Sequence, residues 1–456
     1  MSESIRYYST NLRSPKVSFR EALLQGLAPD RGLYMPDNIP LMTVEDLQSL
    51  SKKEYHEIAY IVASYFLKDE IPASDLKAIV IDAYNYAVPL EKITHRNHIM
   101  RLDQGPTASF KDFAARMMGR LMQYFLKQEN RKMLILTATS GDTGSAIANA
   151  FYGLDNIKVV ILYPRKEVTD RQRKQMTTLH ENITVLALDG KFDDCQAMVK
   201  QAFSDRDLDY LQLSSANSIN IGRLLPQAMY YFYAWSRLAM NHSDEVIFSV
   251  PSGNFGDLMG GLFAKKMGLP VKKFVIATNE NDEVPVFFKT GLYNTIEPSR
   301  NCISSAMNVG HPSNMARIVT LYGGEMSEKG EILQMPNLEF LRNDMYAVSI
   351  SDYETIDTIR QTWLKHKVLL EPHGAVAWAG LMNYYKANPV DENPNQLAVA
   401  LETAHPAKFP QEIIDILDID PEMPESLKGL EGKKEIVQDM SIDYADFKKF
   451  LINNYK

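Results

Sequence analysis

Short apolar runs rich in β-branched residues alternate with helical stretches from about residue 98 onward. Typical helical stretches between the runs are GSAIANAFYG and FDDCQAMVKQAF. The apolar runs occupy residues 133–139, 158–164, 183–190, 246–250, 273–278 and 397–402. Continuous apolar runs indicate strands buried on both faces, and their alternation with helices is typical of parallel sheets. The pattern therefore predicts an α/β fold with open, mostly parallel sheets that helices cover on both faces.

The N-terminal part of the chain lacks this alternation. It mixes turn signals, as in LAPDRGLYMPDNIP, with helix-like segments such as VEDLQSLSKKEYHEIAYIVASYFL. We therefore expect a mixed, helix-rich N-terminal segment over residues 1–95 and α/β domains over 96–237 and 238–420. The acidic, lysine-containing stretch 421–456 is expected to form a helical tail.

The composition is that of a globular protein with a small ligand. The 456 residues are 45% hydrophobic, enough for two or three packed domains. A formal net charge of -8 and a pI near 5.7 give no basic footprint for nucleic acid or for an anionic membrane. The N-terminus MSESIRYYSTNLR has no apolar signal-peptide core, so we expect a cytoplasmic protein. The oligomeric state stays open between monomer and homodimer.

The two cysteines, Cys195 and Cys302, give no sign of a metal site. Neither lies in a CxxC or Cys/His spacing. We expect two buried free thiols and no metal centre.

Three loops directly after predicted strands carry the candidate chemistry, because open parallel sheets bind ligands beyond the carboxyl ends of their strands. TSGDTGSA (139–146) places small residues at the start of a helix, where exposed N–H groups suit a carboxylate. PSGNFGDLMGG (251–261) suits a phosphate but is neither a Walker A loop nor a dinucleotide fingerprint. TAHPAKFP (403–410) opens with a hydroxyl group. Each loop taken alone is equally typical of a tight turn.

One lysine indicates which ligand these loops bind together. Lys111 lies in TASFKDF (107–113), just before the apolar run AARMMGRLM. A lysine amine can form a Schiff base with an aldehyde, which neither arginine nor glutamine can do. Although a lone lysine on an amphipathic helix is ordinarily a surface residue, this lysine together with two anion-binding loops matches pyridoxal phosphate.

The motifs SFKDF, ATSGDTGSA, PSGNFGD, EPHGA and TAHPAKF, in this order, resemble those of the threonine synthase family. The resemblance runs over nearly the whole chain, and YYSTN with GLAPDRGLYMP is typical of the bacterial and fungal branch. It implies a tryptophan-synthase β-like fold, fold type II of the pyridoxal-phosphate enzymes. The implied reaction converts O-phospho-L-homoserine and water to L-threonine and phosphate.

The resemblance also implies a role for each matching residue. Lys111 forms the Schiff base with the cofactor and moves protons, and Thr403 faces the pyridine nitrogen. The loop around the cofactor phosphate consists of Gly253, Asn254, Phe255, Gly256 and Asp257. The residues around the substrate carboxylate and the cofactor's phenolic oxygen are Ser140, Gly141, Asp142 and Thr143.

Asp142 departs from the asparagine that most relatives of this fold carry at this position, although the branch of the threonine synthase family that this chain resembles usually carries aspartate. A carboxylate there repels a substrate carboxylate. We therefore expect Asp142 to hold the shape of the loop and to contact the ligand only indirectly. For His373 and His405, in EPHGA and TAHPAKF, a hydrogen-bonded structural role is favoured over a catalytic one, and the choice stays open.

A phosphorylated substrate also needs cations. SSANSINIGR (214–223) and PRK (164–166) supply candidates, although Arg223 is equally explained as a residue that caps its helix. The predicted phosphate ligands are Ser215, Asn217, Asn220, Arg223 and Lys166, with Arg165 as the next candidate. Two alternatives stay open: a serine or threonine dehydratase or sulfhydrylase of the same fold, and a catalytically silent threonine-synthase-like protein that binds phosphorylated ligands.

Overall fold

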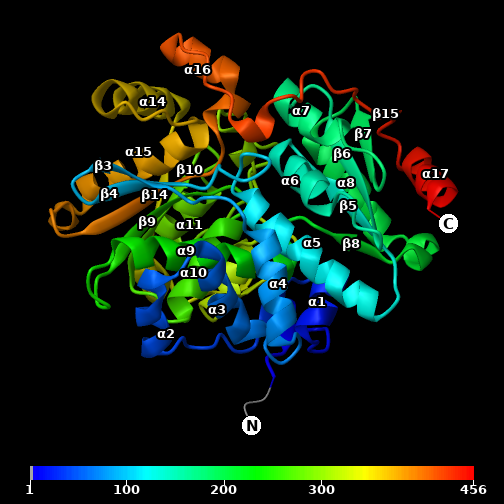
Figure 1. Cartoon of the computed structure of the whole chain (residues 1–456), viewed down its shortest axis with the longest axis horizontal. Coiled ribbons are helices and arrows are strands. Elements are labelled where there is room, and N and C mark those ends of the chain that lie inside the picture. Colours follow the sequence, from blue (N-terminus) through cyan, green and yellow to red (C-terminus); the bar gives the residue numbers. More distant parts are fainter. Residues whose placement is uncertain (1–3, 456) are drawn as a thin grey trace.

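Two separate sheets form the framework of the protein, whose computed structural model describes residues 4–455 (Figure 1). The larger sheet has six strands in the order β13 (Met345–Ser349), β10 (Val271–Thr278), β9 (Val246–Pro251), β14 (Leu397–Glu402), β4 (Asn97–Arg101) and β3 (Leu90–Thr94). The smaller sheet has the order β15 (Gln438–Met440), β7 (Ile183–Leu188), β6 (Ile157–Pro164), β5 (Met133–Ala138) and β8 (Leu213–Ser215). All neighbouring strands run parallel except β3 and β4. The predicted α/β fold is therefore confirmed.

Helices surround both sheets. The smaller sheet is associated with α5 (Lys111–Gln128), α6 (Asp142–Phe151), α7 (Asp170–Thr177), α8 (Phe192–Ser204) and α17 (Tyr444–Asn454). The larger sheet is associated with α9 (Leu225–Leu238), α10 (Gly256–Lys266), α11 (Glu283–Thr290), α14 (Asp352–His366), α15 (Pro372–Ala387) and α16 (Pro410–Leu417). Helix α13 (Leu338–Asp344) packs on β10 and β13 of this sheet, whereas α12 (Met315–Leu321) packs on β11 (Glu325–Met326), which pairs with β12 (Ile332–Gln334) in a separate two-stranded sheet. Each of the six long apolar runs in the sequence falls on a strand that is buried over most of its length.

The N-terminal segment covers one side of this framework, as the blue elements of Figure 1 show. It contains a short antiparallel pair of strands, β1 (Tyr7–Ser9) and β2 (Tyr34–Pro36). Its helices are α1 (Phe19–Gln25), α2 (Val44–Ser49), α3 (Tyr55–Leu67) and α4 (Ala73–Ala83). Helix α3 packs on α9 and α4 packs on α5, so the segment contacts helices that belong to both sheets.

The distribution of strands differs from the expected domain boundaries in two places. Strand β4 lies just after residue 96, yet it pairs with β14 of the larger sheet and not with the sheet that follows it in sequence. Of the predicted tail, the described residues 421–455 contain only one α-helix, α17, and they add strand β15 to the smaller sheet beside β7. Both strands are short or polar, and a strand of that kind lacks the long apolar run by which the others are predicted.

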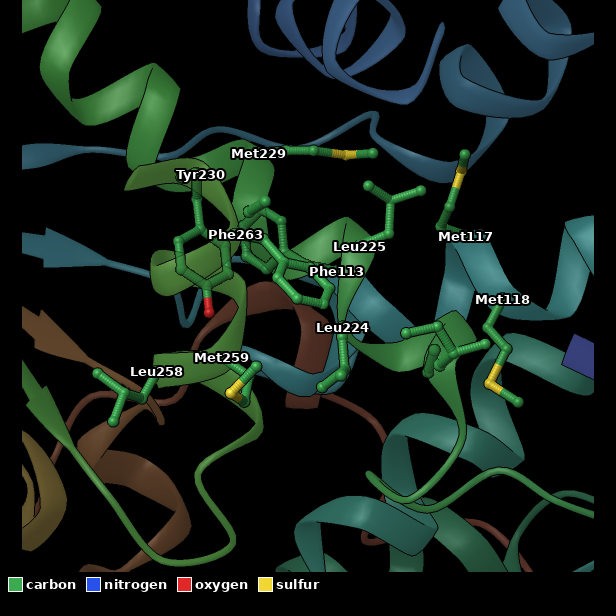
Figure 2. Close-up of a cluster of buried hydrophobic side chains, with 14 of the residues drawn as sticks. Phe113, Met117, Met118, Leu224, Leu225, Met229, Tyr230, Leu258, Met259 and Phe263 are labelled. Atoms are coloured by element: carbon green, nitrogen blue, oxygen red, sulfur yellow. The ribbon is translucent and has the colours of Figure 1, made fainter. Parts of the chain in front are cut away.

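One hydrophobic cluster joins the elements that carry the candidate residues (Figure 2). Phe113 and Met117 of α5 meet Tyr230 of α9 and Met259 of α10 in this cluster. The rings of Phe113 and Tyr230 contact each other edge to face, with centroids 5.6 Å apart. These side chains are fully buried. The cluster therefore fixes the first turns of α5 and α10 relative to the loop before α9.

Candidate active site

A cavity of about 460 Å³ collects residues that follow strands of both sheets. Its walls come from the loops after β5, β8, β9 and β14 and from the start of α5. The predicted residues that line it are Lys111, Ser140, Asp142, Thr143, Asn217, Arg223, Gly253, Asn254, Phe255, Gly256, Asp257 and Thr403. The folded chain thus brings the lysine, both anion-binding loops and the threonine together in one cavity.

Lys111 is the first residue of α5, and its side chain is mostly buried. Its Nζ lies 3.9 Å from Oδ2 of Asp142 and 4.7 Å from the centre of the Phe110 ring. Burial lowers the pKa of Lys111; Asp142 opposes this effect, while the cations of Lys408 and Arg223 add to it. The environment therefore makes the neutral amine, the form that acts as a nucleophile or a base, easier to reach than in an exposed lysine.

Asp142 begins helix α6 and is 3% exposed. Its Oδ1 lies 2.6 Å from Nζ of Lys408 and accepts a hydrogen bond from Nε2 of Gln172 at 2.9 Å. Burial opposes ionisation, yet Lys408, Lys111 and Gln172 hold the pKa of Asp142 well below its ordinary range. Asp142 is thus an ionised carboxylate whose Oδ1 is occupied by other side chains of the protein.

The loop before α6 is held by its own polar groups. Oγ1 of Thr139 accepts hydrogen bonds from the backbone N–H groups of Gly141 and Gly144, at 2.9 and 2.8 Å. Gly141 has a φ of 130°, and a Cβ atom there would lie 2.5 Å from the side chain of Gln172. Glycine is therefore required for this turn, although Gly141 itself does not line the cavity.

The loop after β9 leads into the N-terminus of α10, and Phe255 takes a left-handed conformation with a φ of 61°. The backbone carbonyl of Asn254 accepts a hydrogen bond from Nδ2 of Asn314 at 2.8 Å. Burial raises the pKa of Asp257 to about 7, and its Oδ1 accepts the backbone N–H of Leu258. The loop thus offers backbone N–H groups at a helix N-terminus, which suits an anion.

Of the four residues predicted in the loop 214–223, only Asn217 and Arg223 line the cavity. Arg223 is 3% exposed, and its guanidinium donates to the carbonyl of Ala216 at 2.7 Å. Its Nε–H has no acceptor within the described residues 4–455, and burial lowers the pKa of Arg223 to about 10. Ser215 and Asn220 lie behind the wall: Nδ2 of Asn220 donates to the carbonyl of Ser215, which shapes the loop.

The two cations of PRK lie away from the cavity lining. Lys166 is 79% exposed, and its Nζ lies 2.9 Å from Oδ1 of Asp189. Arg165 forms an ion pair with Asp439 of β15. The structure therefore separates these cations from Lys111, and any contact of Lys166 with a ligand in the cavity requires its loop to move.

The motif EPHGA (371–375) forms the start of α15, which packs against β14. Glu371 caps the helix and accepts hydrogen bonds from the N–H groups of His373 and Gly374. A Cβ atom on Gly374 would lie 1.5 Å from Oε2 of Glu402, so only glycine fits this approach. Burial, followed by the charge of Glu371, raises the pKa of Glu402 well above its ordinary value.

His405 takes part in the connection between two loops. Its backbone N–H donates to the carbonyl of Ala108 at 3.0 Å, and its Nδ1 accepts the N–H of Ala407 at 3.1 Å. Burial lowers the pKa of His405. The ring therefore caps the turn that follows Thr403.

Sequence reasoning missed several residues that line or support the cavity. Ser218, Gln227 and Asn308 line it, and Lys408 and Gln172 hold Asp142 from behind. Lys408 belongs to the TAHPAKF motif, so its place after a strand end was the available signal. Asn308 follows no predicted strand, and nothing in the local pattern marks it.

Family models cover almost the whole chain. The model "Threonine synthase N terminus" matches residues 6–84, "Pyridoxal-phosphate dependent enzyme" matches 87–401 and "Threonine synthase, C-terminal" matches 375–451. The chain is 37% identical over 452 residues to the threonine synthase of Escherichia coli K12, covering 99% of this chain and 100% of the relative. The chain belongs to the threonine synthase family. It is accordingly a pyridoxal-phosphate-dependent enzyme.

Solved structures of threonine synthases agree with this membership. The pyridoxal-phosphate-bound threonine synthase from Brucella melitensis superposes with a TM-score of 0.91 at 34% identity, covering 99% of this chain and 100% of that chain. The yeast threonine synthase gives a TM-score of 0.89 at 32% identity, covering 99% and 98%. Maize serine racemase, at 16% identity, covering 73% of this chain and 92% of that chain, with a TM-score of 0.52, shares the fold alone.

The residues of the cavity fit the cofactor of this family. The amine of Lys111, the N-terminus of α10 and the hydroxyl-bearing Thr403 all line the cavity. A Cβ atom on Gly253 would lie 3.0 Å from the backbone of Ala306 and Met307, which also line the cavity. Within residues 4–455, no group of acidic, histidine or cysteine side chains could hold a metal ion, and no helix is long and apolar enough to span a membrane. Both cysteines are buried and unpaired.

Proposed function

We propose that this threonine synthase converts O-phospho-L-homoserine and water to L-threonine and inorganic phosphate in the cavity at Lys111. The proposal of a phosphorylated substrate rests on the position of Arg223. It is buried, lines the same cavity as Lys111 and forms no ion pair within the described residues. A planar guanidinium binds a phosphate through parallel charge-assisted hydrogen bonds. We further propose that the enzyme acts in the cytoplasm, without a nucleic-acid or membrane partner, which its net charge of -8 supports.

Lys111 is proposed to hold the cofactor aldehyde and to move protons at Cα and Cβ of the substrate. Pyridoxal phosphate, when bound, supplies the electron sink that stabilises the carbanions formed at these carbons. The lowered pKa of Lys111 makes loss of its proton easier than in an exposed lysine, and the neutral amine is the form that accepts those protons.

Two helix N-termini are proposed to divide the anions between them. The residues from Gly253 to Asp257 bind the cofactor phosphate with backbone N–H groups at the start of α10, and Thr403 presents a neutral hydroxyl to the pyridine nitrogen. Ser140 and Thr143 bind the substrate carboxylate at the start of α6. Both loops follow a strand directly, β9 before α10 and β5 before α6, and the division of the two anions between them follows the family resemblance of PSGNFGD and TSGDTG.

Arg223 and Asn217 are proposed to bind the substrate phosphate and to stabilise its charge as the bond at Cγ breaks. Ser215 and Asn220 then act by shaping the loop that carries both residues. Lys166 enters this set only if its loop moves toward the cavity, because its ammonium group pairs with Asp189.

Product analysis tests this function. The protein is incubated with O-phospho-L-homoserine, and phosphate and L-threonine are measured together; equal amounts of both are expected. L-Serine and L-threonine are offered separately, and release of ammonia is measured. Ammonia release faster than phosphate release would instead support a dehydratase. Cofactor absorbance without any product would support a silent binding protein.

A further inference from the structure

Asp142 is the cavity residue whose charge is hardest to reconcile with an anionic substrate. It begins α6, the helix whose N-terminus is proposed to bind the substrate carboxylate. Its side chain is 3% exposed, so water screens its charge poorly. Like charges at close range in such a site repel each other strongly. An ionised Asp142 therefore needs a counter-charge that leaves the cavity receptive to anions.

Lys408 provides a counter-charge that was not among the predicted site residues. Its side chain is fully buried, and its Nζ lies 2.6 Å from Oδ1 of Asp142. The opposite oxygen, Oδ2, lies 3.9 Å from Nζ of Lys111. The three charges thus alternate in the order positive, negative, positive. Their sum is positive whenever Lys111 is protonated and neutral when it is not.

The backbone fixes the place of Lys408. Three hydrogen bonds join the segment after β14 to the segment before α5. The N–H of Phe110 donates to the carbonyl of Thr403 at 2.8 Å, and the N–H of His405 donates to that of Ala108 at 3.0 Å. Nζ of Lys408 itself donates to the carbonyl of Thr107 at 2.9 Å. The motif TAHPAKF therefore delivers Thr403 to the cavity at one end and Lys408 to Asp142 at the other.

We propose that Lys408 is a positioning residue that neutralises Asp142 and so allows the N-terminus of α6 to accept the carboxylate of an amino-acid substrate. The proposal rests on the proposed function and names the residue that makes its carboxylate site electrostatically possible. Gln172 supports the arrangement, because its Nε2 donates to the same oxygen of Asp142 at 2.9 Å. The charge of Lys408 also contributes to the lowered pKa of Lys111.

Ligand binding to the holoenzyme tests the proposal. L-Threonine and L-threoninamide, which lacks the carboxylate, are titrated while the cofactor absorbance is followed. In Lys408→Met, which keeps the length of the side chain but removes its charge, the Kd for L-threonine should rise at least tenfold. The Kd for L-threoninamide should change less than threefold. Lys132→Met, at an exposed position before β5, is the matched control and should leave both constants unchanged.

The double variant D142N/K408M distinguishes electrostatics from packing. It has neither buried charge, so the Kd for L-threonine should return to within threefold of the wild-type value. Equal losses for both ligands in Lys408→Met, or no recovery in the double variant, would overturn the proposal. If L-threonine does not change the cofactor absorbance of the wild-type holoenzyme, both the proposed function and the proposed carboxylate site are contradicted. This outcome differs from the two above, in which the wild-type protein binds L-threonine.

A second readout requires neither cofactor nor activity. Removing one partner of a buried ion pair leaves an uncompensated charge, whereas removing both does not. In cofactor-free protein, Lys408→Met should lower the urea midpoint of unfolding at least twice as much in the wild-type background as in the D142N background. Equal decreases in both backgrounds would show that the two side chains are not coupled, and would overturn the proposal. The double variant also keeps the test informative if Lys408→Met alone folds poorly.

Discussion

Nδ1 of His373 lies 2.5 Å from Oε2 of Glu371, and Nε2 of the same ring accepts the backbone N–H of Ala306 at 3.0 Å. A backbone N–H can only donate, so Nε2 carries no proton and Nδ1 donates to the carboxylate. Both ring nitrogens are thereby occupied. His373 holds the loop that contains Ala306 and Met307, and this loop packs on Gly253 of the α10 loop.

His373→Leu should therefore weaken catalysis without changing its acid–base behaviour. His373→Leu removes both ring hydrogen bonds, and the one from Ala306, which holds the loop at Gly253, is worth about 0.5–1.5 kcal/mol, so kcat/KM for O-phospho-L-homoserine should fall roughly two- to tenfold. The shape of the pH–rate profile should stay the same, because the ring moves no proton in the reaction. Loss of one limb of the profile would identify His373 as an acid or base.

Gly253→Ala should reduce retention of pyridoxal phosphate. A Cβ atom at this position would lie 3.0 Å from the carbonyl oxygen of Ala306 and from Cα of Met307, and backbone yields less easily than a side-chain end. We expect the Kd of the cofactor, measured by equilibrium dialysis, to rise about tenfold or more. Gly432→Ala is the matched control, since a Cβ atom there has no neighbour within 4 Å among the described residues. Equal affinities in the two variants would show that the α10 loop does not hold the cofactor.

Arg223→Ala should lower kcat/KM for O-phospho-L-homoserine by roughly ten- to 150-fold, because a charge-assisted hydrogen bond contributes about 1.5 to 3 kcal/mol. A parallel fall in kcat would show that the guanidinium stabilises the leaving phosphate; a rise in KM alone would show ground-state binding. Arg120→Ala, which removes an ion pair with Asp82, is the control.

The same phosphate-release assay on Lys166→Ala decides whether this cation takes part. A drop matching that of Arg223→Ala would show that the loop of Lys166 moves to the substrate. Kinetics of Arg223→Ala within twofold of wild type, with unchanged inhibition by phosphate, would remove Arg223 from the site.

The raised pKa of Asp257 predicts how the free energy of unfolding of the cofactor-free protein depends on pH. Burial raises its pKa to about 7, whereas an exposed aspartate titrates at about 3.9. Between these values the folded state keeps a proton that the unfolded state has lost. The free energy of unfolding therefore falls as pH rises, by up to about 1.4 kcal/mol per pH unit.

Asp257→Asn cannot titrate and should flatten this slope between about pH 5 and about pH 7. Urea unfolding of both proteins at several pH values measures the difference. Glu283, whose pKa burial also raises to about 7, affects both proteins alike and cancels. Parallel stability curves would show that Asp257 is ionised throughout this range.

The long strands and the cavity loops could be predicted from the sequence because their signals are local. A buried parallel strand is a continuous apolar run, and a loop that follows it lies at the ligand edge of the sheet. The strand-end pattern predicts the positions of Gly253 and Thr403 on the cavity wall, whereas Lys111 is predicted from its Schiff-base chemistry and its motif. Arg223 is predicted from the cations that a phosphorylated substrate needs, and its guanidinium donates to the carbonyl of Ala216 in the same short loop.

Long-range pairings could not be predicted in this way. Lys408 meets Asp142 across more than 250 positions of sequence, and no local pattern records that pairing. Lys166 follows a strand like the other candidates, but its side chain turns to Asp189 at the surface. Which cation enters a cavity depends on side-chain direction and on partners from other strands, and both are properties of the fold.

The central claim is that Lys111 is the amine that holds the cofactor in this cavity. Borohydride reduction of the holoenzyme, followed by peptide mapping and mass spectrometry, tests it most directly, because reduction makes the lysine–cofactor link permanent. We predict one labelled peptide, with the label on Lys111, and no label on Lys408 although its ammonium group lies on the other side of Asp142. A label on any other lysine, with Lys111 unmodified, would contradict the account.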